Sequence, residues 1–172
     1  MNEIREQFIV YLSGTMAQEN EQHRTWRSHA VDLLSKHGIF TRNPYRGRDA
    51  SKIIKVDNYH YTYSTAPVRN RLGNVLVARD LKDVEDSDLL LCNLRGTKGE
   101  RPSIGTLSEL AWAYLLRKPV ICIVDKEDTD KNYYKHPFMH TFIDQWVSNV
   151  EEGVDAIINY WHPQAAEAAE GY

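Results

Sequence analysis

The feature that most constrains the fold is the alternation of short apolar runs with segments of helical spacing. The apolar runs indicate five strands, at residues 8–12, 38–41, 88–94, 119–124 and 146–148. The spacing indicates helices at residues 19–37, 75–85, 106–117, 138–145 and 153–161. Apolar strands that alternate with helices are typical of a parallel sheet covered on both faces. We therefore predict an α/β fold, a doubly wound, largely parallel five-stranded sheet of the Rossmann or flavodoxin type.

The length of the chain fits one domain. Its 172 residues suffice to bury a core, and no internal repeat is evident. We expect the domain to span residues 1–163 and residues 164–172 to form a frayed tail. Residues 42–74 lack clear periodicity and are rich in Arg and Tyr. Irregular segments of that length inside a compact domain are often functional.

Composition excludes some partners. The chain has 21 Lys and Arg against 24 Asp and Glu, a net charge of −3, whereas domains that bind polymeric nucleic acid carry a basic excess. No apolar run approaches the roughly 18 residues of a membrane span, and we do not expect the charged start of the chain to act as a secretory signal. Cys92 and Cys122 lie in apolar runs, which favours buried reduced thiols. We expect a soluble cytoplasmic protein without membrane contact.

Residues 103–109 are the first of three segments that could carry chemistry. A loop containing Gly105 opens a helix there, and the exposed N–H groups of such an end favour an anion. We expect Glu109 in the first turn, where the helix dipole favours its ionised form and an ionised carboxylate suits a nucleophile. The alternative is that Thr106 and Glu109 form a capping box and Glu109 merely caps its own helix.

Asp80 is the second candidate. It lies beside an expected apolar stripe of Val77, Leu81 and Val84. A carboxylate next to a buried stripe is costly unless it has a partner, although Asp80 at the stripe edge could simply reach water. The acids that follow it indicate a solvated surface: Asp83, Glu85 and Asp86. Asp88 is expected to hold a loop or a helix terminus.

The third segment directly follows the first strand. Ser13 and Thr15 offer hydroxyl donors for an anion, and Gly14 lets a ligand approach the backbone. The segment lacks the glycine-rich fingerprint of dinucleotide-binding proteins and the phosphate-binding loop of proteins that bind nucleoside triphosphates, so NAD and ATP chemistry lose support. The histidines show no paired metal spacing. We expect no metal site.

The three segments occur together, in this order, in the nucleoside 2-deoxyribosyltransferase-like family, which the chain resembles over roughly residues 7–161. The family includes nucleoside 5′-monophosphate N-glycosidases. The matching pieces are Tyr11-Leu12-Ser13-Gly14, then Ala78-Arg79-Asp80-Leu81 leading eight residues on to Asp88, then Gly105-Thr106 with Glu109-Leu110-Ala111-Trp112-Ala113.

The resemblance implies a role for each catalytic candidate. Glu109 would attack the anomeric carbon, displace the base and hold the sugar covalently, which is the chemistry of a retaining glycosidase. Asp80 matches the carboxylate that assists the leaving base, and Tyr11 matches a tyrosine near the sugar. The family needs no cofactor. The implied partner is a small nucleotide or nucleoside.

One departure from the family helps to choose the substrate. True deoxyribosyltransferases usually carry an aspartate six residues before the glutamate, where this chain has Ser103. A carboxylate would repel a 5′-phosphate, whereas a serine hydroxyl can donate to it. Further expected substrate-binding residues are Ser13, Gly14, Thr15, Gly105 and Thr106. Arg46 and Arg48 are candidates for phosphate or base recognition, or are solvated loop arginines.

The resemblance also implies a homodimer or a higher homo-oligomer with shared active sites. Met139 matches a methionine on a loop that reaches into the neighbouring site, although Pro137 stands where the family often has a polar residue.

The leading expectation is cleavage of the N-glycosidic bond of a (deoxy)nucleoside 5′-monophosphate. One alternative is a nucleoside 2-deoxyribosyltransferase that exchanges bases on a deoxynucleoside. Another is a non-catalytic nucleotide-binding domain.

Overall fold

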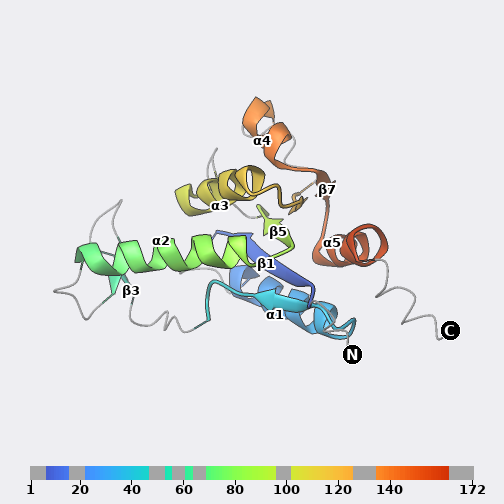
Figure 1. Ribbon diagram of the computed structural model, residues 1–172, viewed down its shortest axis with the longest axis horizontal. Coiled ribbons are helices and arrows are strands. Elements are labelled where there is room, and N and C mark those ends of the chain that lie inside the picture. The colour runs from blue at the N-terminus through green and yellow to red at the C-terminus, as the bar shows by residue number, and fades with distance from the viewer. Residues whose placement is uncertain are drawn as a thin grey trace, which may run out of the picture.

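A five-stranded sheet in the order β2-β1-β5-β6-β7 forms the centre of the protein in the computed structural model (Figure 1). Its strands are β1 (Ile9–Gly14), β2 (Phe40–Arg42), β5 (Leu89–Asn93), β6 (Val120–Ile123) and β7 (Gln145–Val147). Every neighbouring pair in this sheet is parallel, which confirms the predicted sheet. The structure describes residues 7–15, 22–46, 53–55, 61–63, 69–95, 102–125 and 135–162, so the expected tail lies outside the described residues.

Helices cover both faces of the sheet, as a doubly wound fold requires. On one face, α1 (Gln22–Ser35) packs against α5 (Val150–Ala156), which continues into a π-helical turn, η4 (Ile157–Trp161). On the other face, α3 (Ile104–Leu115) lies between α2 (Arg69–Glu85) and α4 (Pro137–Phe142), as Figure 1 shows.

Two hydrophobic clusters hold these layers together. Alternate residues of β1 pack into opposite clusters, because successive side chains along a strand point to opposite faces of the sheet. Val10 and Leu12 pack with α1 and α5, whereas Tyr11 packs with α3. Cys92 and Cys122 are buried, free and paired in register between β5 and β6, as the apolar runs around them predict.

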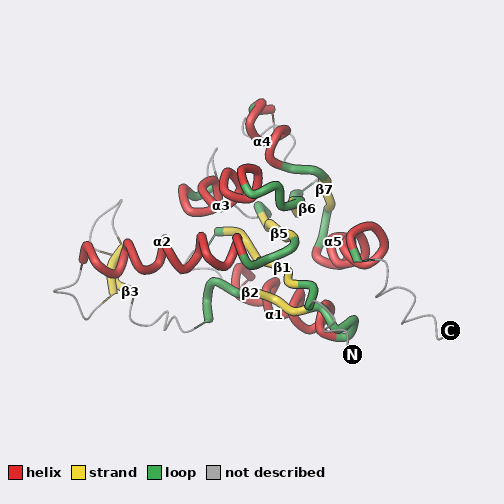
Figure 2. Tube along the Cα trace, in the orientation of Figure 1, coloured by secondary structure: helices red, strands yellow, loops and turns green. Residues whose placement is uncertain are grey.

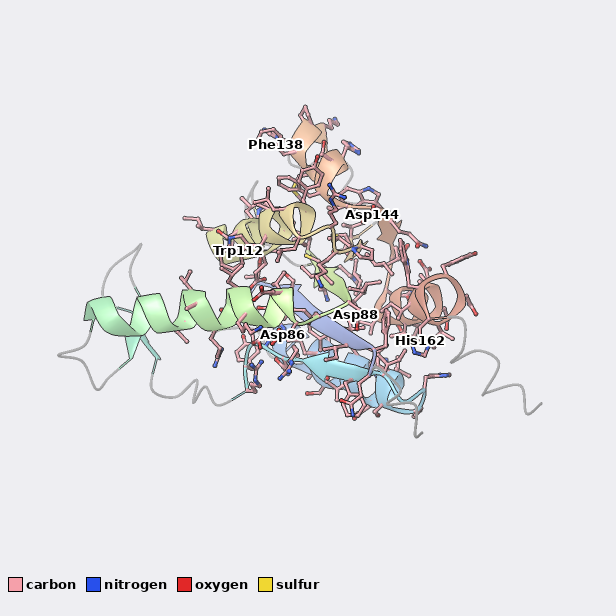
Figure 3. The ribbon with its side chains drawn as sticks, viewed as in Figure 1. Asp86, Asp88, Trp112, Phe138, Asp144 and His162 are labelled. Atoms are coloured by element: carbon pink, nitrogen blue, oxygen red, sulfur yellow. The ribbon has the colours of Figure 1, made fainter. Side chains whose placement is uncertain are left out.

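Carboxylates anchor the amino ends of the strands. Asp88 Oδ2, just before β5, accepts a hydrogen bond from Ile9 N at 2.7 Å, and Asp144 Oδ2, just before β7, accepts one from Val120 N at 2.8 Å (Figure 3). Each carboxylate thus satisfies the first N–H of the neighbouring strand. Asp88 has the structural role that we expected, although it holds a strand rather than a helix terminus.

Residues 42–74 contain more regular structure than their pattern indicates (Figure 2). β3 (Ile53–Lys55) and β4 (Tyr61–Tyr63) form an antiparallel pair, and α2 begins at Arg69 rather than at 75. Three-residue strands are too short to show a periodicity, and Gly73 in the first turns of α2 resembles a break although a helix tolerates it.

Two further boundaries differ from the prediction. The helix expected at 138–145 ends at Phe142, because β7 starts at Gln145. α5 starts at Val150 rather than at 153, because Asn149 caps it by accepting a hydrogen bond from Glu152 N at 2.7 Å.

No helix among the described residues is long and apolar enough to cross a membrane.

Candidate active site

The candidate site lies where the strand order of the sheet reverses. β2 flanks β1 on one side and β5 flanks it on the other, so the chain winds away from the β1–β5 pair in opposite directions. Ligands of open α/β sheets bind beyond the carboxyl ends of the strands at such a switch point. The end of β1 brings Tyr11, Ser13 and Gly14 there, and Thr15 follows directly.

Gly14 is required by the backbone at the end of β1. Its φ is +145°, and a Cβ on it would lie 2.7 Å from the carbonyl oxygen of Asn93 on β5. A larger residue would therefore be strained and would collide with the neighbouring strand. This contact explains the glycine that follows Ser13 without any substrate.

Glu109 points from α3 into the sheet. α3 begins at Ile104, with Ser103 as its N-cap, so Glu109 lies in the second turn instead of the first. Its Oε1 accepts a hydrogen bond from Tyr11 Oη at 2.8 Å, and its Oε2 accepts one from Ser13 Oγ at 2.5 Å. The capping-box alternative is therefore wrong, because the carboxylate is held by β1 rather than by its own helix.

Burial dominates the electrostatics of Glu109. The residue is 8% exposed, and its pKa is raised from 4.5 to about 7, with loss of water as the largest cause. The hydrogen bonds from Ser13 and Tyr11 oppose this rise, and so does the charge of Arg27, whereas the charge of Asp80 adds to it. Burial and the neighbouring Glu109 also raise the pKa of Tyr11 far above its ordinary value, so the phenol stays a donor.

Asp80 lies on α2 close enough to act on this pair. Its charge raises the pKa of both Tyr11 and Glu109. Its carboxylate is 16% exposed and is 3.2 Å from Arg79 Nη2. Asp80 therefore has a partner at the stripe edge, and a second carboxylate stands near the buried glutamate.

The face of α2 that is buried in the structure differs from the apolar face that the spacing predicts. Val77 and Leu81 are exposed, whereas Asp83 is buried with Val84. The prediction that Asp83 is a solvated acid is wrong: its Oδ1 and Oδ2 each accept a hydrogen bond from Arg46 at 2.5 Å. A bidentate guanidinium partner lets a carboxylate stay buried, which spacing alone does not reveal.

This pair changes the interpretation of Arg46. Its guanidinium is bound to Asp83, and Arg79 donates to the carbonyl oxygens of Pro44 and Arg46 at 2.8 and 3.2 Å. Together these bonds fasten the turn after β2 onto α2. In this structure Arg46 is engaged as an anchor, while Arg48 lies outside the described residues.

Ser103 caps α3 and also has a hydroxyl proton that it can donate. Its Oγ accepts a hydrogen bond from Thr106 N at 3.2 Å and lies 2.8 Å from Thr106 Oγ1, where either hydroxyl can be the donor. When Thr106 donates, the proton of Ser103 is left for a ligand. Gly105 is exposed in this first turn, whereas Thr106 is buried.

Thr15 and Met139 differ in what the structure offers. Among the residues that the structure describes, Thr15 Oγ1 is buried and has no hydrogen-bond partner, which is uncommon for a buried hydroxyl. Met139 is 2% exposed and packs in the α3–α4 cluster of its own chain. It is therefore part of that core, rather than a side chain that projects toward a neighbouring molecule.

Arg27 is a functional candidate that the sequence analysis missed. This residue of α1 is fully buried at the end of β1, and its charge lowers the pKa of Glu109. The available signal was a charged residue three and seven positions before Ala30 and Leu34, on the buried face of the helix. Asp83 gave a similar signal: it lies three residues after Asp80, so the two acids share one face of α2.

In the ranges that the structure describes, no group of three or more His, Cys, Asp or Glu side chains is arranged to hold a metal ion.

Comparisons with known proteins identify the fold. Neither a protein-family model nor a curated protein sequence matches the chain. A conserved protein from Enterococcus faecalis V583 superposes with a TM-score of 0.60 at 16% identity, over 90% of this chain and 99% of that one. The CMP N-glycosidase BcmB from Clostridium botulinum gives a TM-score of 0.51 at 17% identity, over 88% and 99%.

The fold is shared with an N-glycosidase. At these identities the likeness shows the fold alone, and the chain spans nearly the whole length of both proteins.

Proposed function

We propose that this protein cleaves the N-glycosidic bond of a (deoxy)nucleoside 5′-monophosphate through a covalent glycosyl-glutamate intermediate. The products are the free base and the sugar 5-phosphate. No cofactor enters the proposal.

The observation that carries the proposal is the seating of Glu109. A buried carboxylate at the switch point of the sheet accepts hydrogen bonds from Tyr11 and Ser13, and a second carboxylate, Asp80, stands nearby. Two carboxyl groups with distinct environments are what retaining glycosidic chemistry requires. The fold shared with a CMP N-glycosidase adds support.

The proposed reaction has two steps. Glu109 attacks C1′ of the sugar, the bond from C1′ to the base nitrogen breaks, and the base leaves with that electron pair and takes a proton from Asp80. Water then attacks C1′ and gives a proton back to Asp80, the bond from C1′ to Glu109 breaks, and the carboxylate and the sugar 5-phosphate are released. Tyr11 and Ser13 fix the attacking carboxylate, and burial strengthens its attraction to the positive transition state.

The phosphate role of Ser103 and Thr15 rests on hydroxyl chemistry. Thr15 follows β1 and Ser103 precedes α3, so both belong to loops at the carboxyl end of the sheet. The hydroxyl of Thr15, which is buried and has no partner within the described part of the chain, and the exposed first turn at Gly105 both suit an anion. Neither residue adds a negative charge that would repel a phosphate.

The test is release of base from a panel of ribo- and deoxyribonucleoside 5′-monophosphates and the matching nucleosides, followed by liquid chromatography. Each substrate is run with and without a free base, beside Glu109→Gln and the exposed control Glu85→Gln. We expect base from a monophosphate, no new nucleoside, and loss of activity by orders of magnitude only in the Glu109 variant. Mass spectrometry of quenched enzyme should find a sugar-phosphate adduct on the Glu109 peptide.

Other outcomes would replace the proposal. New nucleoside that forms only with added base identifies a deoxyribosyltransferase and removes the phosphate role of Ser103. Binding of nucleotide without turnover, equal in wild type and in the Glu109 variant, identifies a non-catalytic nucleotide-binding domain.

We also propose that the protein acts as a homodimer through α3. This helix has one charged residue, the buried Glu109, and its outer stripe is uncharged: Ile104, Ser108, Ala111 and Leu115. Ile104 is 85% exposed and Leu115 is 75% exposed. In an antiparallel crossing about a two-fold axis, Ile104 of one copy meets Leu115 of the other and the small residues meet in the middle.

Sedimentation velocity tests the dimer. We expect a dimer for wild type and a folded monomer for Leu115→Glu, whereas Lys118→Glu, on the loop after the helix, should stay dimeric. A wild-type monomer across the accessible concentrations contradicts this assignment.

A further inference from the structure

The buried guanidinium of Arg27 is the group whose presence the proposed chemistry does not yet explain. Its side chain is fully buried, and burial lowers its pKa because water no longer solvates the charge. Taking a cation out of water is costly in proteins. A fold retains such a group only where its contacts repay that cost.

The contacts of Arg27 bracket Ser13. Nε donates to the carbonyl oxygen of Leu12 at 3.1 Å and Nη2 donates to that of Gly14 at 2.7 Å. Ser13, between these two residues, donates to Glu109 Oε2. The rigid fork of one guanidinium therefore fixes the backbone on both sides of the residue that holds the proposed nucleophile.

The sheet leaves these two carbonyl groups without a strand partner. The carbonyl of Phe8 accepts a hydrogen bond from Phe40 of β2, and that of Ile9 accepts one from Asp88 beside β5. Because carbonyls alternate along a strand, those of Leu12 and Gly14 point to the β2 side. β2 pairs with β1 only as far as Tyr11, opposite Arg42. Arg27 thus takes the place of the missing strand.

The surroundings close the guanidinium off from water. Its Cζ lies 4.6 Å from the centre of the Trp26 ring and 5.1 Å from that of the Tyr45 ring. Tyr45 belongs to the turn after β2 that Arg79 and the Arg46–Asp83 pair fasten onto α2. Screening by solvent is weak at such a site, so the charge acts over a longer range than on the surface.

Charges from several elements meet at Glu109. The phenol of Tyr11 faces it from β1 and Asp80 from α2, with Asp83 of α2 acting on Tyr11. Arg27 from α1 is a positive group that acts on Glu109, and Cys92 of β5 and Tyr45 also lie within the electrostatic reach of Arg27. Its charge opposes that of Asp80.

We propose that Arg27 is a positioning residue for the site: it fixes Ser13 through the two flanking carbonyls and supplies a positive charge that acts on Glu109. This inference rests on the proposed role of Glu109 and assigns Arg27 no contact with substrate. The two functions, geometry and charge, can be separated by substitution.

Arg27→Lys keeps the charge and loses the fork, whereas Arg27→Gln keeps one donor and loses the charge. Lys82→Met, which removes an exposed positive charge from α2, is the matched control. For each variant the ionisation of Glu109 is followed by carbon-13 NMR, with Glu109→Gln to assign the signal, and base release is measured against pH. Circular dichroism and thermal unfolding identify any variant that does not fold.

We expect the Glu109 titration and the acidic limb of the base-release profile to move to higher pH in Arg27→Gln, and to stay near wild type in Arg27→Lys and Lys82→Met. A shift of one unit lowers the ionised fraction about tenfold well below the pKa. Arg27→Lys should instead lose kcat with little change in KM.

Two results would overturn the inference: an unchanged Glu109 titration in folded Arg27→Gln, or full kcat in Arg27→Lys. If Arg27→Gln does not fold, the kcat of Arg27→Lys still decides the geometric part. If wild type releases no base, the proposed function fails, while the NMR titration still tests the charge of Arg27.

Discussion

Ser13 Oγ lies 2.5 Å from Glu109 Oε2, although 96 residues separate the two in the sequence. The serine lies near the carboxyl end of β1, and the glutamate lies on α3, the helix that follows β5. β5 is the neighbour of β1 in the sheet. The topological switch point therefore brings together the donor and the acceptor of the site.

Removing a hydroxyl donor from Glu109 should shift the pH dependence of base release. The hydrogen bonds from Ser13 and Tyr11 both lower the pKa of Glu109. We expect Ser13→Ala and Tyr11→Phe each to raise it and to move the acidic limb of the profile upward. A hydrogen bond to a charged group contributes about 1.5 to 3 kcal/mol, which corresponds to roughly one to two pH units. Unmoved profiles in both variants would show that the hydroxyls do not hold the ionised form.

Glu109 should make the protein less stable as the pH rises. Its folded pKa of about 7 lies above the ordinary value of 4.5, so the folded state binds the proton more tightly than the unfolded state does. The stabilisation that protonated Glu109 contributes is then fully present below its unfolded pKa of 4.5, and it is lost progressively as the pH rises to about 7. We expect Glu109→Gln to exceed wild type by about 3 kcal/mol at pH 8 and by much less at pH 5. Urea unfolding at both pH values measures the difference; an equal gap at both would contradict the buried, raised carboxyl.

Breaking the Arg46–Asp83 pair should cost more from one side than from the other. The side chain of Asp83 is 5% exposed and that of Arg46 is 40% exposed. Arg46→Met leaves a buried carboxylate without its partner, whereas Asp83→Asn leaves a guanidinium that can reach water. We expect Arg46→Met to destabilise the protein more than Asp83→Asn by on the order of 2 kcal/mol in urea unfolding. The reverse order would mean that Asp83 has another partner.

Gly14 and Gly38 offer a matched test of backbone strain. Both have positive φ, +145° and +69°, but a Cβ on Gly14 meets Asn93 O at 2.7 Å, whereas one on Gly38 meets nothing within 4 Å. We expect Gly38→Ala to cost about 1 kcal/mol, and Gly14→Ala to cost more and to disturb Ser13. Thermal unfolding of the two variants compares them directly; equal losses would show that β1 can move away from β5.

Much of the fold was predictable because it depends on local composition. A strand buried on both faces must be apolar along its whole length, so β1, β5 and β6 stand out in the sequence. β3 and β4 do not stand out, because three residues cannot display a period. The start of α3 was misplaced by two residues because Thr106 with Glu109 imitates a capping box, while the cap is Ser103.

The candidate site was predictable only in part, since a side chain's partner is not written beside it. Tyr11, Ser13 and Glu109 were chosen as candidates from their segments, and the structure joins them by hydrogen bonds. Asp83 was taken for a surface acid, because its burial depends on Arg46, a residue 37 positions away.

The sequence by itself determined the sheet, its helices and the segments that carry the polar groups, because periodicity and turn chemistry act between near neighbours. Only the tertiary structure decided which of those groups lose water and which partner each one meets. Arg27 shows the difference: its sequence position marks one charge on a helix, and its role follows from the two β1 carbonyls that β2 is too short to reach. Desolvation and hydrogen bonding depend on distances in space, which the order of residues does not contain.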